Sequence, residues 1–276
     1  MIGWVVLGIG GSCWQRQIDG LSAADSYITE GDRFYMQRSD PEKLNQAIQA
    51  WQDGLQVVPE DVTLLSRLAQ AYTTRALSNP EYSPDDFIVA REHGIRCLKT
   101  DTFLAGVAQT YGGRLVPRAL RTVDVTLIDC LVWTSISWSR WLQLHGAAGA
   151  SLDLEIVAAL ASKAVQLNAE HDRSRPQHAL GLALSLPPAP LSPDLAGAEA
   201  ALSAAIAASP DRWWIEVDLA EMVYAPTEQT ERFSTLLTEI TTRSPDAHPQ
   251  ESLENRAAIT HAEQLLTVGS SSGWKP

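Results

Sequence analysis

The sequence predicts an all-α fold, a compact bundle of about a dozen helices, from three observations. Apolar residues recur at spacings of three and four, as at Leu44, Ala47 and Trp51, which places them on one face of a helix. No stretch alternates apolar and polar residues for long enough to indicate a sheet. Several segments pair a capping side chain with a following proline, which is typical of the first turn of a helix. These segments are Asp40-Pro41, Ser83-Pro84, Ser192-Pro193, Ser209-Pro210 and Ser244-Pro245.

Composition excludes several classes of partner. The 276 residues include 21 basic and 33 acidic side chains, a formal net charge of −12, and no cluster of Lys or Arg. Such a chain is repelled by nucleic acid and by an anionic membrane surface. After the N-terminus no stretch approaches the roughly 18–20 apolar residues that would span a bilayer. We therefore expect no nucleic-acid partner and no membrane-spanning helix in the body of the protein.

The N-terminal stretch "VVLGIGGSCW" has two interpretations. Gly8 and Gly10 match a dinucleotide-binding loop, but Cys13 replaces its third glycine and no βαβ unit follows. The apolar residues 2–9 followed by Gly10-Gly11-Ser12-Cys13 resemble a bacterial lipoprotein signal, which is cut before a cysteine that carries the lipid. We expect a signal peptide over residues 1–12 and lipidation of Cys13; an N-terminus without a signal is the alternative.

The other two cysteines, Cys97 and Cys130, could form one disulfide, but the sequence cannot show that they lie close enough. Both lie within apolar helical patterns, where a free cysteine acts as a small hydrophobic residue. The favoured interpretation is two buried free thiols.

A frame of small and large residues around a proline repeats along the chain. At Pro59 the frame consists of Ala47, Trp51 and Gly54 before the proline and Leu68, Ala69 and Tyr72 after it. At Pro210 the same offsets give Ala198, Leu202 and Ala205, then Leu219, Ala220 and Val223. The frame resembles the tetratricopeptide repeat, a helix–turn–helix unit. Insertions at 78–125 and 186–193 interrupt degenerate copies, so we expect irregular repeats closed into a bundle over residues 13–268, with a flexible tail over 269–276.

The expected helix over residues 123–145 carries too many large side chains for one narrow core stripe. Trp133 lies some 140° around the axis from Trp138, and Trp141 is one turn from Trp138. We expect an apolar cavity beside Trp133 and Trp138, where Arg140 could pair with a ligand carboxylate. The alternative is that the tryptophans are core and Arg140 extends to solvent.

Three further aromatic residues are candidates for binding. Tyr72 holds a packing position of the repeat and is a weaker candidate for the cavity wall than for the core. Trp213 and Trp214 point about 100° apart on a helix, so at most one faces the core squarely. The other is a candidate contact for a protein partner.

Three stretches between about residues 85 and 266 resemble the T component of tripartite ATP-independent periplasmic (TRAP) transporters, the TatT family. They are "LVWTSISWSRWLQL" from Leu131, "RPQHALGLALSLPP" from Arg175, and "AEAALSAAIAASPDRWWIEVDLAEMVYAPTEQTERFSTLLTEI" from Ala198. The resemblance implies an all-helical lipoprotein with a central cavity or pore and no catalytic residues. It also implies a periplasmic substrate-binding partner, the P component, uptake of a small hydrophobic or carboxylated solute, and association as a homotrimer.

No enzyme signature is present. The chain lacks GxSxG, HExxH and P-loop motifs, and the grouping of His171, Asp172 and His178 matches no metal spacing. We expect no catalytic residue, no metal and no cofactor. The function predicted is the accessory T subunit of a TRAP-type system, lipid-anchored to the outer membrane and facing the periplasm. The alternatives are an envelope lipoprotein that only scaffolds other proteins, and a cytoplasmic tetratricopeptide adaptor.

Overall fold

The computed structural model of the protein describes residues 24–79, 83–146, 151–186 and 193–272. Within these ranges every regular element is helical and no strand occurs, which confirms the all-α prediction. Residues 24–35 form a first helix. The longer helices that follow are α2 (Pro41–Val57), α3 (Val62–Ser78), α4 (Ser83–Leu98), α5 (Thr102–Thr110), α6 (Ile128–His145), α7 (Ser151–Asn168), α8 (His171–Ser185), α9 (Leu195–Ala208), α10 (Trp214–Leu219), α11 (Thr230–Thr241) and α12 (Ser252–Ser272).

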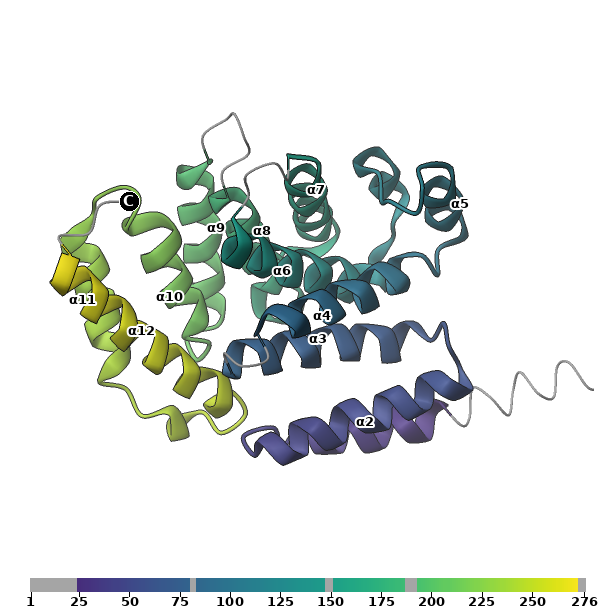
Figure 1. The fold of residues 1–276 in the computed structure, drawn as a ribbon, viewed down its shortest axis with the longest axis horizontal. Coiled ribbons are helices and arrows are strands. Elements are labelled where there is room, and N and C mark those ends of the chain that lie inside the picture. Colours follow the sequence, from purple (N-terminus) through teal and green to yellow (C-terminus); the bar gives the residue numbers. More distant parts are fainter. Residues whose placement is uncertain (1–23, 80–82, 147–150, 187–192, 273–276) are drawn as a thin grey trace, which may run out of the picture.

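Short helical turns complete the fold: η1 (Pro117–Thr122), η2 (Val125–Leu127) and η4 (Pro245–Ala247) are 3₁₀ turns, and η3 (Ala220–Tyr224) is a π-helical turn that continues α10. Helices adjacent in sequence pack against each other, α3 on α4, α6 on α7, and α8 on α9. Figure 1 shows α12 on the opposite side of the molecule from α5, crossing in front of α11. Because α12 also packs against α3, the C-terminal helix closes the bundle onto its N-terminal part.

Helix α6 is the centre of the core. All its residues from Cys130 to Arg140 are buried, because α3, α4, α7 and α8 pack around it. The crossing with α4 is close: a Cβ atom added to Gly94 would collide with the side chain of Thr134. The helix is therefore enclosed on every side along these residues.

The close crossing of α4 and α6 also corrects the expectation of two free thiols. A disulfide joins Cys97 on α4 to Cys130 on α6, with their Cα atoms 5.7 Å apart. Both residues are fully buried, as the apolar pattern indicated. The pattern places each cysteine on the inner face of its helix, but it cannot show that these two faces meet within bonding distance.

Three of the five predicted helix starts are found, at Pro41, Ser83 and Pro245, and the last of these begins only the 3₁₀ turn η4. Asp40 caps α2 with Pro41 in the first turn, and α4 begins at Ser83. Ser209 instead follows the end of α9, and α10 begins only at Trp214. Ser192 lies outside the described residues, and Asp194 caps α9. The positions of the small and large frame at Pro59 and Pro210 are buried where helices meet.

The expected signal peptide over 1–12 and the lipid site Cys13 lie outside the described residues. At the other end, α12 runs to Ser272 and so includes residues 269–272, which the sequence placed in a tail. Within the described part of the chain no helix is both long enough and apolar enough to cross a membrane.

Candidate functional site

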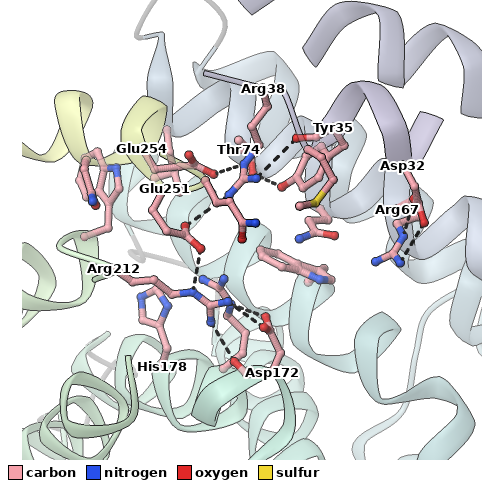
Figure 2. Close-up of a pocket in the computed structure, with 18 of the residues that line it drawn as sticks. Asp32, Tyr35, Arg38, Arg67, Thr74, Asp172, His178, Arg212, Glu251 and Glu254 are labelled. Atoms are coloured by element: carbon pink, nitrogen blue, oxygen red, sulfur yellow. Dashed lines mark hydrogen bonds and ion pairs between the residues drawn. The ribbon is translucent and has the colours of Figure 1, made fainter. Parts of the chain in front are cut away.

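A pocket of about 590 Å³ lies in the centre of the bundle. The N-terminal helical hairpin consists of the first helix and α2, and its residues 29–38 line the pocket. The rest of the wall comes from α3, α6, α8, α10 and the start of α12, so both ends of the chain contribute to it (Figure 2). Among its lining residues are Asp32, Arg38, Arg67, Asp172, Arg175, Arg212, Glu251 and Glu254. The pocket wall therefore combines many charged side chains with aromatic and aliphatic ones, among them Trp133, Trp214 and Leu77.

The charged groups form a chain of alternating sign, called here the charged ladder. Its members in order are Glu254, Arg38, Glu251, Arg212, Asp172 and Arg175. The ion-pair distances along it are 2.8, 3.4, 3.4, 2.7 and 3.1 Å. Figure 2 shows Glu251 between Arg38 and Arg212, which joins the N-terminal hairpin to the α10 region through α12. Each carboxylate of the ladder thus contacts at least one guanidinium.

The N-terminal wall is held by local contacts. Tyr35 lies below the guanidinium of Arg38, which is 4.6 Å from its ring centre. The hydroxyl of Tyr35 is 3.0 Å from the hydroxyl of Thr74 on α3. Burial raises the pKa of Tyr35, so its hydroxyl stays protonated at neutral pH. At the far end of the pocket Arg67 pairs with Asp32 at 3.0 Å.

The backbone at the start of α8 is strained and aims two ladder residues into the pocket. Asp172, Arg173 and Ser174 have φ angles of 43°, 53° and 64°, in the left-handed region that disfavours residues with a Cβ atom. Arg173 turns toward Asp211, 2.6 Å away, while Asp172 and Arg175 line the pocket. Strain of this kind concentrates at functional sites, where the surrounding structure holds it in place.

The pKa of Asp172 reflects its position between two cations. Burial would raise its pKa, but Arg175 and Arg212 outweigh burial and lower the pKa to about 2. Burial and the neighbouring Arg212 lower the pKa of Arg175, although it remains a cation at neutral pH. The ladder is therefore ionised along this segment.

A buried triad supports the pocket wall at α6, α8 and α10. Asp218 is fully buried and lies 2.6 Å from Arg140 and 2.7 Å from His178. Burial lowers the pKa of His178, so the ring is neutral at pH 7. Burial opposes ionisation of Asp218, yet Arg140 and His178 keep its pKa below the usual range. The triad is thus a carboxylate shared by a guanidinium and a neutral imidazole.

The structure places the two central tryptophans in different pockets. Trp133 lines the central pocket, and the guanidinium of Arg175 lies 4.9 Å from its ring centre. Trp138 lines a second pocket between α4 and α7, where Arg91 lies 5.1 Å from its ring. The two residues point to opposite sides because they lie about 140° apart on α6. Among the described residues the two tryptophans thus line separate pockets, and a single apolar cavity beside both stays a prediction.

The remaining predicted residues are distributed around the core. Trp141 is half-buried and stacks on His145, with ring centres 4.6 Å apart. Arg140 is 4 % exposed and pairs with Asp218 rather than extending to solvent. Tyr72 is buried and accepts a hydrogen bond from Gln52 at 2.7 Å. None of the three lines the central pocket.

The two neighbouring tryptophans of α10 take different positions. Trp213 is 3 % exposed and packs in a hydrophobic cluster with α11 and α12, which leaves no exposed ring face for a partner. Trp214 lines the central pocket, with Arg140 5.2 Å from its ring. Trp213 thus faces the core, and a contact between Trp214 and a protein partner stays a prediction.

The charged ladder was not anticipated from the sequence. Arg38 and Glu254 are 216 residues apart, and no local pattern indicates that they pair. A weak signal exists in the spacing: Tyr35 and Arg38, like Glu251 and Glu254, are three residues apart, which puts each pair on one side of a helical turn. Within the described residues no group of His, Cys, Asp and Glu is arranged to hold a metal ion.

Comparison with known protein families identifies one family for this chain. Residues 87–271, from α4 to the end of α12, match the family model of the TRAP transporter T-component. The match includes α6, α8, α10 and α12, each of which contributes residues to the pocket wall. Comparison with curated proteins finds no match. Because the family model covers well over half of the chain, the protein belongs to the TRAP transporter T-component family.

Proposed function

We propose that the protein is the accessory T subunit of an ATP-independent periplasmic uptake system, in which it docks the substrate-binding P component and holds a small solute in the central pocket. Family membership supports the transporter role. The observation that carries the solute-handling part is the pocket of about 590 Å³, a volume within the range of small-molecule sites. Members of the family are accessory subunits of transporters, and no step of the proposal requires catalysis.

The proposed location is the outer membrane, with a lipid on Cys13 and the helical domain in the periplasm. The disulfide between Cys97 and Cys130 supports a compartment outside the cytoplasm, because disulfides persist where thiols are not kept reduced. Labelling cells with an alkyne fatty acid tests the anchor: the wild-type chain should carry label and Cys13→Ala should not. A Cys97→Ala, Cys130→Ala double variant is the matched control and should keep the label.

Docking of the P component is tested with the purified full chain. A mixture of the chain and the P component of its own transporter should elute earlier in size-exclusion chromatography than either alone. A substrate-binding protein of an ATP-driven importer from the same periplasm is the control and should not change the elution. Light scattering on the same samples gives the subunit number, for which we propose a homotrimer. Two proteins that elute separately at every ratio would contradict the T-subunit role.

A scaffold lipoprotein without a ligand is the alternative, and one observation favours it. Every carboxylate of the charged ladder already contacts a guanidinium, so the ladder could act only as a connection between α12 and the N-terminal hairpin. Buried ion networks of this type can specify one arrangement of helices. Ligand binding by the isolated chain separates the two functions, and the chemistry of that ligand can be inferred from the pocket wall.

A further inference from the structure

Two hydrogen-bond acceptors in the pocket wall lack a donor among the described residues, namely Oε2 of Glu254 and Nδ1 of His178. The side chain of His178 is only 3 % exposed. Its Nε2 lies 2.7 Å from the carboxylate of Asp218, which can only accept, so Nε2 carries the proton and Nδ1 keeps a lone pair. A buried acceptor without a donor is costly. A ligand that brings N–H donors would therefore be stabilised here.

The same wall offers donors. Arg175 donates its Nε to Asp172 at 3.1 Å, and its two terminal nitrogens make no further hydrogen bond in the described part of the chain. Nε1 of Trp214, which also lines the pocket, is a buried donor without an acceptor. A guanidinium with two free amino groups matches the geometry of a carboxylate. The pocket therefore has an end suited to an anionic group.

The charges of the pocket wall indicate which charge type of ligand it favours. The pocket wall contains five guanidiniums and four carboxylates, those of Arg33, Arg38, Arg67, Arg175 and Arg212 and those of Asp32, Asp172, Glu251 and Glu254. A simple anion would be attracted by the guanidiniums and repelled by the carboxylates, whereas a simple cation would be repelled by the guanidiniums and attracted by the carboxylates. A molecule with both charges gains from both sets. Alternating wall charges thus favour a dipolar ligand.

The aromatic residues of the pocket indicate which type of cationic group the ligand carries. A quaternary ammonium needs open aromatic faces. Arg38 covers the ring of Tyr35 at 4.6 Å, Arg175 that of Trp133 at 4.9 Å, and Arg140 that of Trp214 at 5.2 Å. Each ring thus already has a cation over one face, while the acceptors on Glu254 and His178 require N–H donors. A primary ammonium suits this wall better than a trimethylammonium.

From these contacts we propose that the central pocket binds a small zwitterion of the amino-acid class, with its carboxylate on Arg175 and its ammonium facing Glu254 and His178. The inference deepens the proposed solute-handling function and rests on it. It differs from the hydrophobic solute considered from the sequence, because the pocket wall is charged. Figure 2 shows Glu254 and His178 on the same side of the pocket, with Asp172, the partner of Arg175, at its lower edge.

The test uses the isolated full chain and three matched pools of small molecules: the free amino acids, their N-acetyl derivatives and their amides. Saturation-transfer NMR detects binding in each pool. The free amino acids should bind, whereas the N-acetyl pool lacks the ammonium and the amide pool lacks the carboxylate, so both should give no signal. Equal signals from all three pools, or none from any, would overturn the proposal. Because no P component is present, either result leaves the docking experiment unaffected.

Substitutions locate the site. Glu254→Gln keeps an amide oxygen for Arg38 but removes the charge, and Arg175→Lys keeps the charge but loses the paired amino groups. Each should weaken binding of the best amino acid at least tenfold. Glu239→Gln, the same chemical change at an exposed position of α11, is the matched control and should bind as the wild type does. Circular dichroism checks that each variant is folded, and wild-type affinity in both folded pocket variants would place the ligand elsewhere.

Discussion

At the residue scale, Asp218 is the side chain whose removal the fold should tolerate least. It is fully buried between Arg140 and His178, and Asp218→Asn would leave the guanidinium of Arg140, 4 % exposed, without a counter-charge. Uncompensated buried charges cost about 3–5 kcal/mol, so we expect the free energy of unfolding to fall by that amount. Urea unfolding followed by circular dichroism measures it.

The matched control for Asp218 is Asp246, which pairs with Arg256 at 2.9 Å on the surface. Both side chains are well exposed, at 75 % and 49 %. Exposed ion pairs contribute about 0–1 kcal/mol, so Asp246→Asn should leave the unfolding free energy within that margin. If the two variants were equally stable, the triad would not be a buried charge network.

His93 should make the stability fall in mild acid. Its ring stacks on Tyr72, and burial together with the nearby Arg96 lowers its pKa to about 4. Between pH 6.5 and pH 4 the unfolded chain binds a proton that the folded chain refuses, so stability is lost as the pH falls through this window. We expect a loss of about 2–3 kcal/mol by pH 4.5.

Urea unfolding at pH 7 and pH 4.5 gives the total loss, and His93→Gln should reduce it by about 2–3 kcal/mol. The buried His178, whose pKa is also lowered, contributes separately. His145→Gln alters an exposed histidine of α6 and is the matched control, which should keep the wild-type difference between the two pH values. An unchanged difference in His93→Gln would show that other groups carry the acid sensitivity.

The sequence predicts which residues are buried better than it predicts which residues they contact. The apolar pattern correctly buries Cys97 and Cys130, yet their bond depends on how closely α4 crosses α6. Arg140 was expected at a ligand or in solvent and instead pairs with Asp218, 78 residues away. Periodicity gives the direction of a side chain about its own helix axis, and it contains no information on which helix lies opposite.

At the scale of elements, the strained start of α8 makes a test of backbone conformation possible. Ser174 has a φ of 64°, which glycine adopts without a steric penalty. Ser174→Gly should therefore raise the unfolding free energy by about 1 kcal/mol, provided that the strain exceeds the entropy of the added glycine. Thermal unfolding of the variant beside the wild type measures the change.

The matched control is Ser203→Gly, which makes the same change at an exposed position inside α9. There the backbone is helical, so glycine should lower stability by about 0.5 kcal/mol. Changes of the same sign in the two variants would contradict the strain at Ser174. No glycine in the sequence indicates this turn, because Ser174 is followed directly by Arg175 and Pro176.

Helix existence was predictable, while helix boundaries depended on the cap. Aspartate caps such as Asp40, Asp61 and Asp101 each accept a backbone N–H at the start of a helix. Ser209 has a similar sequence context but donates its hydroxyl to the carbonyl of Arg173 on α8. A serine that bonds to another helix cannot cap its own, and this competition is invisible without the packing.

At the scale of the whole molecule, closure of the bundle depends on contacts between the ends of the chain. Arg38 follows the first helix, and its guanidinium bonds Glu254 on α12 at 2.8 Å and Glu251, in the turn just before α12, at 3.4 Å. The repeat pattern predicts that neighbouring helices stack. It says nothing about contacts over 216 residues, so the charged wall of the pocket could not be predicted with the helices.

Arg38 should accordingly control the opening of α12. Arg38→Met removes the cation that Glu254 and Glu251 contact. Burial already raises the pKa of Glu254, so losing the charge of Arg38 makes burial of this carboxylate less favourable and favours separation of α12 from the N-terminal hairpin. Hydrogen exchange read by mass spectrometry should become at least tenfold faster over residues 252–258 and 30–38, while the α6 core remains protected.

Arg67→Met removes a half-exposed cation from the same pocket and is the matched control. Equal exchange in both variants would mean that α12 is held by its packing against α3, α10 and α11 and not by Arg38.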